Sequence, residues 1–219
     1  MASPRVLLLL LFLIPNGPSA AQQQGDVVRL SIQENGREIG REEFTLTKTR
    51  ARGTAGTTLT ANARSPVSTP TTRLSAVLER APDLAIAKFQ LEVDGPEGTT
   101  VILAAGSGAR LIVRTVAKGS ESGRELPGGP DVVLLDDGVN SLYCQVADLA
   151  TPTGRQLTAI FPRTGKRATF TARREPGGEG GTIRTALSGD LAGTLVTDAE
   201  GRLQRLELPG RNITVTRME

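Results

Sequence analysis

The sequence predicts a mainly β protein: a strongly bent antiparallel meander, forming a half-barrel or an open barrel, with one amphipathic helix packed on its concave side. Short segments with alternating apolar and polar residues recur along the chain and are separated by turn residues, a pattern typical of antiparallel sheets. The one convincing helix lies near residues 137–149. Its apolar stripe consists of Val139, Leu142, Tyr143, Val146 and Leu149.

The first 21 residues have the pattern of a cleaved secretory signal peptide. Arg5 supplies a short positive region, residues 6–14 are an unbroken apolar run, and small residues precede the expected cleavage site before Gln22. That run is too short to span a bilayer, which takes about 20 residues. We therefore expect residues 22–219 to form a single antiparallel β domain that is periplasmic or secreted, without a lipobox, and does not span a membrane; an uncleaved N-terminal anchor is the alternative.

The mature chain opens with a predicted hairpin. Val28, Leu30 and Ile32 alternate with polar residues, and Asn35-Gly36 follows them. This dipeptide favours the positive φ angles that a type I′ hairpin turn needs. The return strand is expected over residues 37–48, with a bulge or tight bend at Ile39-Gly40.

Further strands are expected wherever the alternation resumes between Gly- and Pro-containing turns, and short links of this kind favour antiparallel pairing. They are predicted at residues 57–63, 71–79, 85–94, 99–105, 110–117, 156–161, 168–174, 182–187, 193–197, 203–208 and 213–217.

Two segments interrupt this succession. Residues 119–130 are rich in Gly, Ser and Pro, which predicts a flexible surface loop. Residues 131–135 lead into the helix, whose N-terminus Asp136 or Asp137 can cap and which ends before Pro152.

Composition excludes several chemistries. The chain has no histidine, so Ser-His-Asp and Cys-His catalysis and ordinary zinc sites are excluded. The single Cys144 has no basic residue within a helical turn to activate it, and we interpret it as a buried apolar residue. The formal charge of +3 and the 3% aromatic content argue against nucleic acid as a partner. We expect no cofactor and no metal.

The segment from Gly36 to Phe44, in the first hairpin, fits a G-x-x-I-G-x-E-x-F pattern, and the segment from Gly193 to Arg217 contains the last strands. In these two segments the chain resembles the uncharacterised periplasmic DUF3108-like and DUF6134-like proteins, and more loosely the lipoprotein-carrier fold of the LolA/LppX type. It implies a strongly bent antiparallel sheet with an apolar concave side and, in the lipid-carrier relatives, a lipophilic ligand.

We therefore expect an exported, non-enzymatic protein that binds a lipophilic molecule or an envelope component. A structural or protein-interaction module of the envelope is the alternative, and a hydrolase that uses a pair of carboxylates is a less favoured one. A curved sheet can offer an apolar cleft to a ligand, although the same side chains can simply fill the interior. The expected pocket or core wall consists of Phe44, Phe89, Val139, Leu142, Tyr143, Val146 and Phe161.

Overall fold

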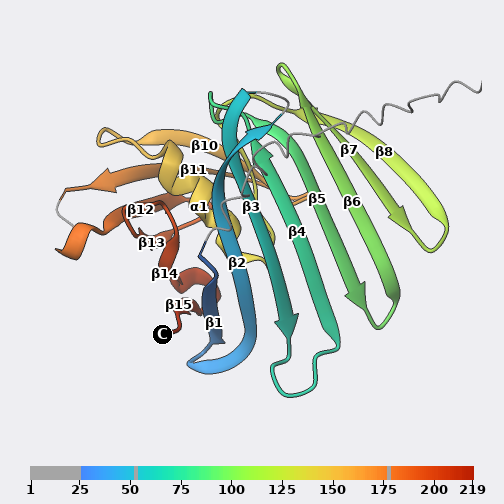
Figure 1. Cartoon of the computed structure of the whole chain (residues 1–219), viewed down its shortest axis with the longest axis horizontal. Coiled ribbons are helices and arrows are strands. Elements are labelled where there is room, and N and C mark those ends of the chain that lie inside the picture. The colour runs from blue at the N-terminus through green and yellow to red at the C-terminus, as the bar shows by residue number, and fades with distance from the viewer. Residues whose placement is uncertain (1–25, 52–53, 177–178) are drawn as a thin grey trace, which may run out of the picture.

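A computed structural model describes residues 26–51, 54–176 and 179–219 (Figure 1). The expected signal peptide, residues 1–21, lies outside the described residues. The described chain is mainly β, as predicted: one sheet bends into a nearly closed barrel shape, and one short helix accompanies it.

The described strands form one 15-stranded sheet in the order β8-β7-β6-β5-β4-β3-β2-β1-β15-β14-β13-β12-β11-β10-β9. Every neighbouring pair is antiparallel except β9 and β10, which are parallel. The strand bounds are β1 (Val28–Glu34), β2 (Arg37–Ala51), β3 (Thr54–Ser65), β4 (Thr72–Arg80), β5 (Ile86–Gly95), β6 (Gly98–Ser107), β7 (Arg110–Ala117), β8 (Ser120–Pro127), β9 (Val132–Leu134), β10 (Arg155–Ile160), β11 (Arg167–Glu175), β12 (Ile183–Gly189), β13 (Gly193–Thr197), β14 (Leu203–Leu208) and β15 (Ile213–Arg217).

The first and last described strands pair with each other in the middle of the sheet. Figure 1 shows β2 to β8 side by side in one half of the sheet and β10 to β15 in the other, with the helix between the halves. At the seam between the two sheet ends, Arg124 of β8 donates a hydrogen bond to the carbonyl oxygen of Pro162, in the turn after β10.

The predicted first hairpin is confirmed. Asn35 and Gly36 both have positive φ angles, of 52° and 77°, as a type I′ turn requires. The bulge is also present: Ile32 pairs with Gly40 and Gln33 pairs with Glu38, so Ile39 is the extra residue. It bends β2 near its start.

The flexible loop predicted at residues 119–130 is wrong. Most of that segment is β8, which pairs with β7 along its whole length from Ser120 to Pro127. Only Leu126 of this strand is buried. Backbone hydrogen bonds to β7 hold this strand in place. Because most of its side chains are exposed, its sequence lacks the apolar alternation by which the other strands are recognised.

The helix begins later than predicted. A 3-10 turn, η1 (Asn140–Tyr143), continues into α1 (Cys144–Leu149), and the preceding Val139 is extended and provides no side-chain cap. The predicted capping by Asp136 or Asp137 is therefore wrong. The Asp136 carboxylate accepts a hydrogen bond from the backbone N–H of Gly138 at 2.8 Å and two from Arg163, at 2.6 and 2.8 Å. Asp137 forms an ion pair with Arg211.

The helix is capped from the sheet. Glu42 of β2 is buried, and its two carboxylate oxygens accept hydrogen bonds from the backbone N–H groups of Asn140 at 2.7 Å and Ser141 at 2.9 Å. The first backbone N–H groups of a helix have no acceptor within the helix, so they need another partner when they are buried. A strand residue distant in sequence therefore fixes where the helix begins.

The helix fills the space between the two halves of the sheet. η1 packs against β2, β3 and β14, while α1 packs against β11, β12 and β13. All five residues of the predicted apolar stripe are at most 2% exposed. No helix in the described part of the chain is long and apolar enough to cross a membrane.

Candidate functional site

The seven residues expected to line a pocket lie in the packed core. Phe44 belongs to β2 and Phe89 to β5, Phe161 follows β10, and the other four belong to the helix or directly precede it. None is more than 9% exposed. The cavity between Leu59, Leu78 and Cys144 is only about 10 Å³, which is room for one water molecule at most. Ligand contact by these seven residues stays a prediction.

A much larger space, a groove of about 620 Å³, lies on the outward face of β1 to β5. Its floor is backbone, because the residues along its middle, Leu30, Glu42, Ala63 and Leu74, are buried on the other face. Two rows of outward side chains flank this floor. The local sequence patterns do not predict this groove.

The first row is dominated by arginine and crosses four strands. Arg41 of β2 stands opposite Arg64 of β3, Arg64 stands opposite Arg73 of β4, and Arg73 stands opposite Asp94 of β5. Directly opposite residues on one face have Cβ atoms about 4.5–5.5 Å apart, and like charges placed there destabilise the sheet. We call Arg41, Arg64 and Arg73 the arginine ladder.

Only one end of the arginine ladder is neutralised. Arg41 donates two hydrogen bonds to Glu38, at 2.9 and 3.2 Å, and this contact holds the pKa of Glu38 below its ordinary value. The side chains of Arg64 and Arg73 make no hydrogen bond or ion pair with any residue that the structure describes. Asp94 accepts a hydrogen bond from Thr99 Oγ1 at 3.3 Å. The guanidinium groups of Arg64 and Arg73 therefore have no ion-pair partner among the described residues, and Asp94 is the one acid that stands directly opposite either of them.

The second row of the groove is polar and has a mixed charge. Arg29 and Glu43 form an ion pair at 3.1 Å at one end. The row continues across the strands with Asn62, Ser75 and Glu92, which stand opposite one another in register. Amide, hydroxyl and carboxylate groups thus face the arginine ladder across the groove floor and can hydrogen-bond a polar ligand.

Tyr143 and Cys144, the single tyrosine and the single cysteine of the sequence, are not activated for chemistry. Cys144 is 1% exposed, and burial raises the pKa of its thiol, so the nucleophilic thiolate is disfavoured. Burial likewise raises the pKa of Tyr143 to about 12. Among the described residues, no three His, Cys, Asp or Glu side chains gather closely enough to hold a metal ion.

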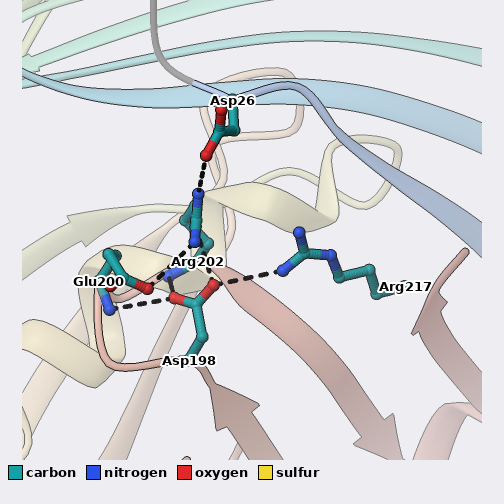
Figure 2. A network of polar contacts seen from close by, with 5 residues as sticks. All are labelled: Asp26, Asp198, Glu200, Arg202 and Arg217. Carbon is teal, nitrogen blue, oxygen red and sulfur yellow. Dashed lines mark hydrogen bonds and ion pairs between the residues drawn. The ribbon is translucent and has the colours of Figure 1, made fainter. Parts of the chain in front are cut away.

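A second charged cluster surrounds Asp198, in the turn between β13 and β14 (Figure 2). Its carboxylate accepts hydrogen bonds from Arg202 Nε at 2.8 Å and from Arg217 at 3.2 Å, and also from the backbone of Glu200 and Arg202. Arg202 in turn contacts Asp26 at 3.0 Å. The cluster ties the start of the described chain to its last strand. Because its charges compensate one another, we assign it a structural role.

The groove could not be predicted from the sequence because its residues are far apart along the chain. Arg41, Arg64 and Arg73 lie on three strands, and each reads locally as an ordinary outward residue. Only the register of β2, β3 and β4 brings them side by side. A count of arginines at the outward positions of the predicted strands could have indicated a positively charged outer surface. It could not have shown which arginines stand opposite each other.

No family model matches the chain, and no curated protein matches it significantly. Among solved structures, a DUF1089 family protein from Pseudomonas aeruginosa aligns with 78% of this chain and 90% of its own, with 13% identity and a TM-score of 0.49. The similarity to the DUF3108-like, DUF6134-like and carrier families stays a prediction.

Proposed function

We propose that this is an exported, non-enzymatic binding protein for a lipophilic or amphiphilic component of the cell envelope, and that the groove on β1 to β5 is its binding site. The observation that carries the proposal is the groove volume of about 620 Å³. It falls within the roughly 300–1,000 Å³ that small-molecule sites occupy. The cavity between Leu59, Leu78 and Cys144 beside the helix, by contrast, is only about 10 Å³.

An apolar strip beside the groove supports a ligand with a lipophilic part. On the same outward face, Glu92 of β5 stands opposite Val101 of β6, which stands opposite Val116 of β7. Val116 is 37% exposed and Ile112, also on β7, is 47% exposed. An amphiphile with its head group in the groove can extend its apolar part over β6 and β7.

Binding is a better proposal than catalysis. The sequence holds no histidine, and the only cysteine is buried within the helix. Of the outward acids in the groove, Glu43 is held in an ion pair and Asp94 accepts a hydrogen bond from Thr99. Glu92 stands opposite Ser75 and Val101 and so has no second carboxylate opposite it. A hydrolase that uses paired carboxylates therefore remains the less favoured alternative.

One observation favours the second candidate, a protein-interaction module. β8 is at the end of the sheet order, so its outer edge pairs with no described strand. Exposed strand edges are templates for pairing with another chain, and the apolar Ile112 and Val116 lie on the neighbouring strand.

The proposal is tested by mass spectrometry of the mature protein purified from the periplasm without detergent. The variant Ser75→Trp places a large side chain in the groove at an exposed position. The control Ser188→Trp makes the same change at an exposed position of β12. We expect a co-purifying amphiphile with the unsubstituted protein and the control, and its loss with Ser75→Trp. Repeated ligand-free preparations of the unsubstituted protein would overturn the proposal. If Ser75→Trp still co-purified with the amphiphile, the groove would not be the binding site.

A further inference from the structure

We infer that the groove recognises the oxyanion of its ligand, a phosphate or carboxylate head group, and that Arg64 and Arg73 are the residues that bind it. This inference rests on the proposed function and deepens it. The two guanidinium groups come from directly opposed positions on β3 and β4. They extend from the outward face into the groove, which they line.

The charge pattern of the protein makes this pair exceptional. Most described arginines elsewhere on the sheet and its turns are matched with acids, as in Arg155–Asp131 at 2.7 Å and Arg184–Glu175 at 2.7 Å. Those without an acid partner, namely Arg37, Arg124, Arg167 and Arg174, do not stand opposite another arginine. Arg64 and Arg73 face each other without an acid within ion-pair distance in the described chain. Placing like charges opposite each other costs stability, and a bound anion would remove that cost.

The chemistry of the side chains points to an oxyanion. A guanidinium group presents a rigid fork of N–H donors that matches the oxygens of a carboxylate or phosphate. Two such forks on adjacent strands can contact one anionic group from both sides. Arg41 is already held by Glu38, so we expect it to contribute positive potential more than direct contact.

The acids around the pair limit the ligand to one anionic group. Asp94 continues the row beyond Arg73, and Glu92 and Glu43 occupy the facing row. A polyanion such as a nucleic acid would place further negative charges against these carboxylates. A single-headed amphiphile avoids this repulsion, and its apolar part meets the strip on β6 and β7.

Three probes with twelve-carbon chains separate the inference from the proposed function: dodecyl phosphate, dodecanoate (whose carboxyl carbon is the twelfth) and the neutral dodecyl maltoside. Each is titrated calorimetrically into the mature protein below its critical micelle concentration and at low salt. The test variant is Arg64→Gln/Arg73→Gln. The control Arg37→Gln/Arg167→Gln removes the same charge from exposed positions of β2 and β11 that do not line the groove.

We expect at least one of the two anionic probes to bind the unsubstituted protein and the control at least tenfold more tightly than the test variant. The tighter of the two identifies the oxyanion. Dodecyl maltoside should bind the test variant and the unsubstituted protein alike. Equal binding of neutral and anionic probes, or no weakening in the test variant, would overturn the inference but leave the proposed function standing. Failure of all three probes to bind the unsubstituted protein would overturn both.

A second measurement does not depend on the variants. In two-dimensional amide NMR spectra of the unsubstituted protein, the bound anionic probe should shift the signals of Arg64 and Arg73 and their neighbours on β3 and β4. Shifts confined to the helix or to β10–β12 would contradict the inference. Raising the salt concentration should weaken the binding, because exposed charges are screened.

Discussion

Glu42 is the residue at which two opposing electrostatic effects can be compared directly. Its carboxylate accepts two backbone N–H groups at the start of the helix, which favours the charged form. It is also 1% exposed, and burial favours the neutral form. Burial prevails and raises the pKa of Glu42 to about 7. This acid is therefore protonated in the folded chain at pH values where it is ionised in the unfolded chain.

The pH dependence of stability follows from that difference. Between the unfolded pKa of 4.5 and the folded pKa of about 7, the folded chain binds more protons, so stability falls as the pH rises. The contribution of Glu42 is fully present below pH 4.5 and is lost as the pH passes 7. At 1.36 kcal/mol for each unit, we expect the loss to be about 3 kcal/mol. Urea unfolding at pH 4.5, 6 and 8 measures it.

The variant Glu42→Gln should show no such loss between pH 4.5 and 8, because the amide does not titrate. The control Glu43→Gln changes the neighbouring residue, whose side chain is 57% exposed, and should keep the pH dependence of the unsubstituted protein. If Glu42→Gln and the unsubstituted protein follow the same curve, the fall has another origin.

At the scale of the element, the helix acts as a plug for the sheet. It lies between the two halves (Figure 1) and contacts strands of both. Leu142 is fully buried at its centre. Removing a buried side chain loses its transfer free energy and leaves a cavity. The packing of the whole interior should therefore depend on this side chain.

We expect Leu142→Ala to lower the free energy of unfolding by about 2–5 kcal/mol. Ile112→Ala removes an apolar side chain that is 47% exposed, and as a control it should cost about 0.5 kcal/mol or less. Chemical unfolding followed by circular dichroism measures both. Equal losses in the two variants would show that the helix is not packed as a plug.

At the scale of the whole molecule, strand stability is set by position in the sheet and not by position in the chain. β15 is the last strand, but it lies between β1 and β14 and its Val215 is fully buried. β8 lies mid-chain, but it is at the end of the sheet order and is mostly exposed. Local opening is easiest where few buried contacts oppose it.

Hydrogen exchange should therefore be at least tenfold slower for amides of β15 than for those of β8. Mass spectrometry of exchanged, digested protein measures both segments in one experiment, so each serves as the reference for the other. Faster exchange in β15 would mean that the C-terminal strand frays despite its two neighbours.

The strands are the part of the fold that the sequence predicts best. The bounds of β7, β13, β14 and β15 match the predicted segments residue for residue, and the turn at Asn35-Gly36 is as expected. These features depend on neighbouring residues alone: on alternation along a strand and on positive φ angles in a turn. The helical period of Leu142, Tyr143, Val146 and Leu149 is local too, and these residues lie in the helix as predicted. Val139 lies before the helix, and the helix is not amphipathic, because its polar Asn140, Ser141 and Gln145 are also buried.

The start of the helix, strand β8 and the groove depend on contacts that local sequence does not contain. Glu42, 98 residues before Asn140, decides where the helix begins. β8 is a strand because β7 offers it a free edge. The arginine ladder arises from the register of β2, β3 and β4. The sequence by itself determined the strands and the apolar face of the helix. Only the tertiary structure decided the cap, the edge strand and the outward groove, because each of them joins residues that are distant in the chain.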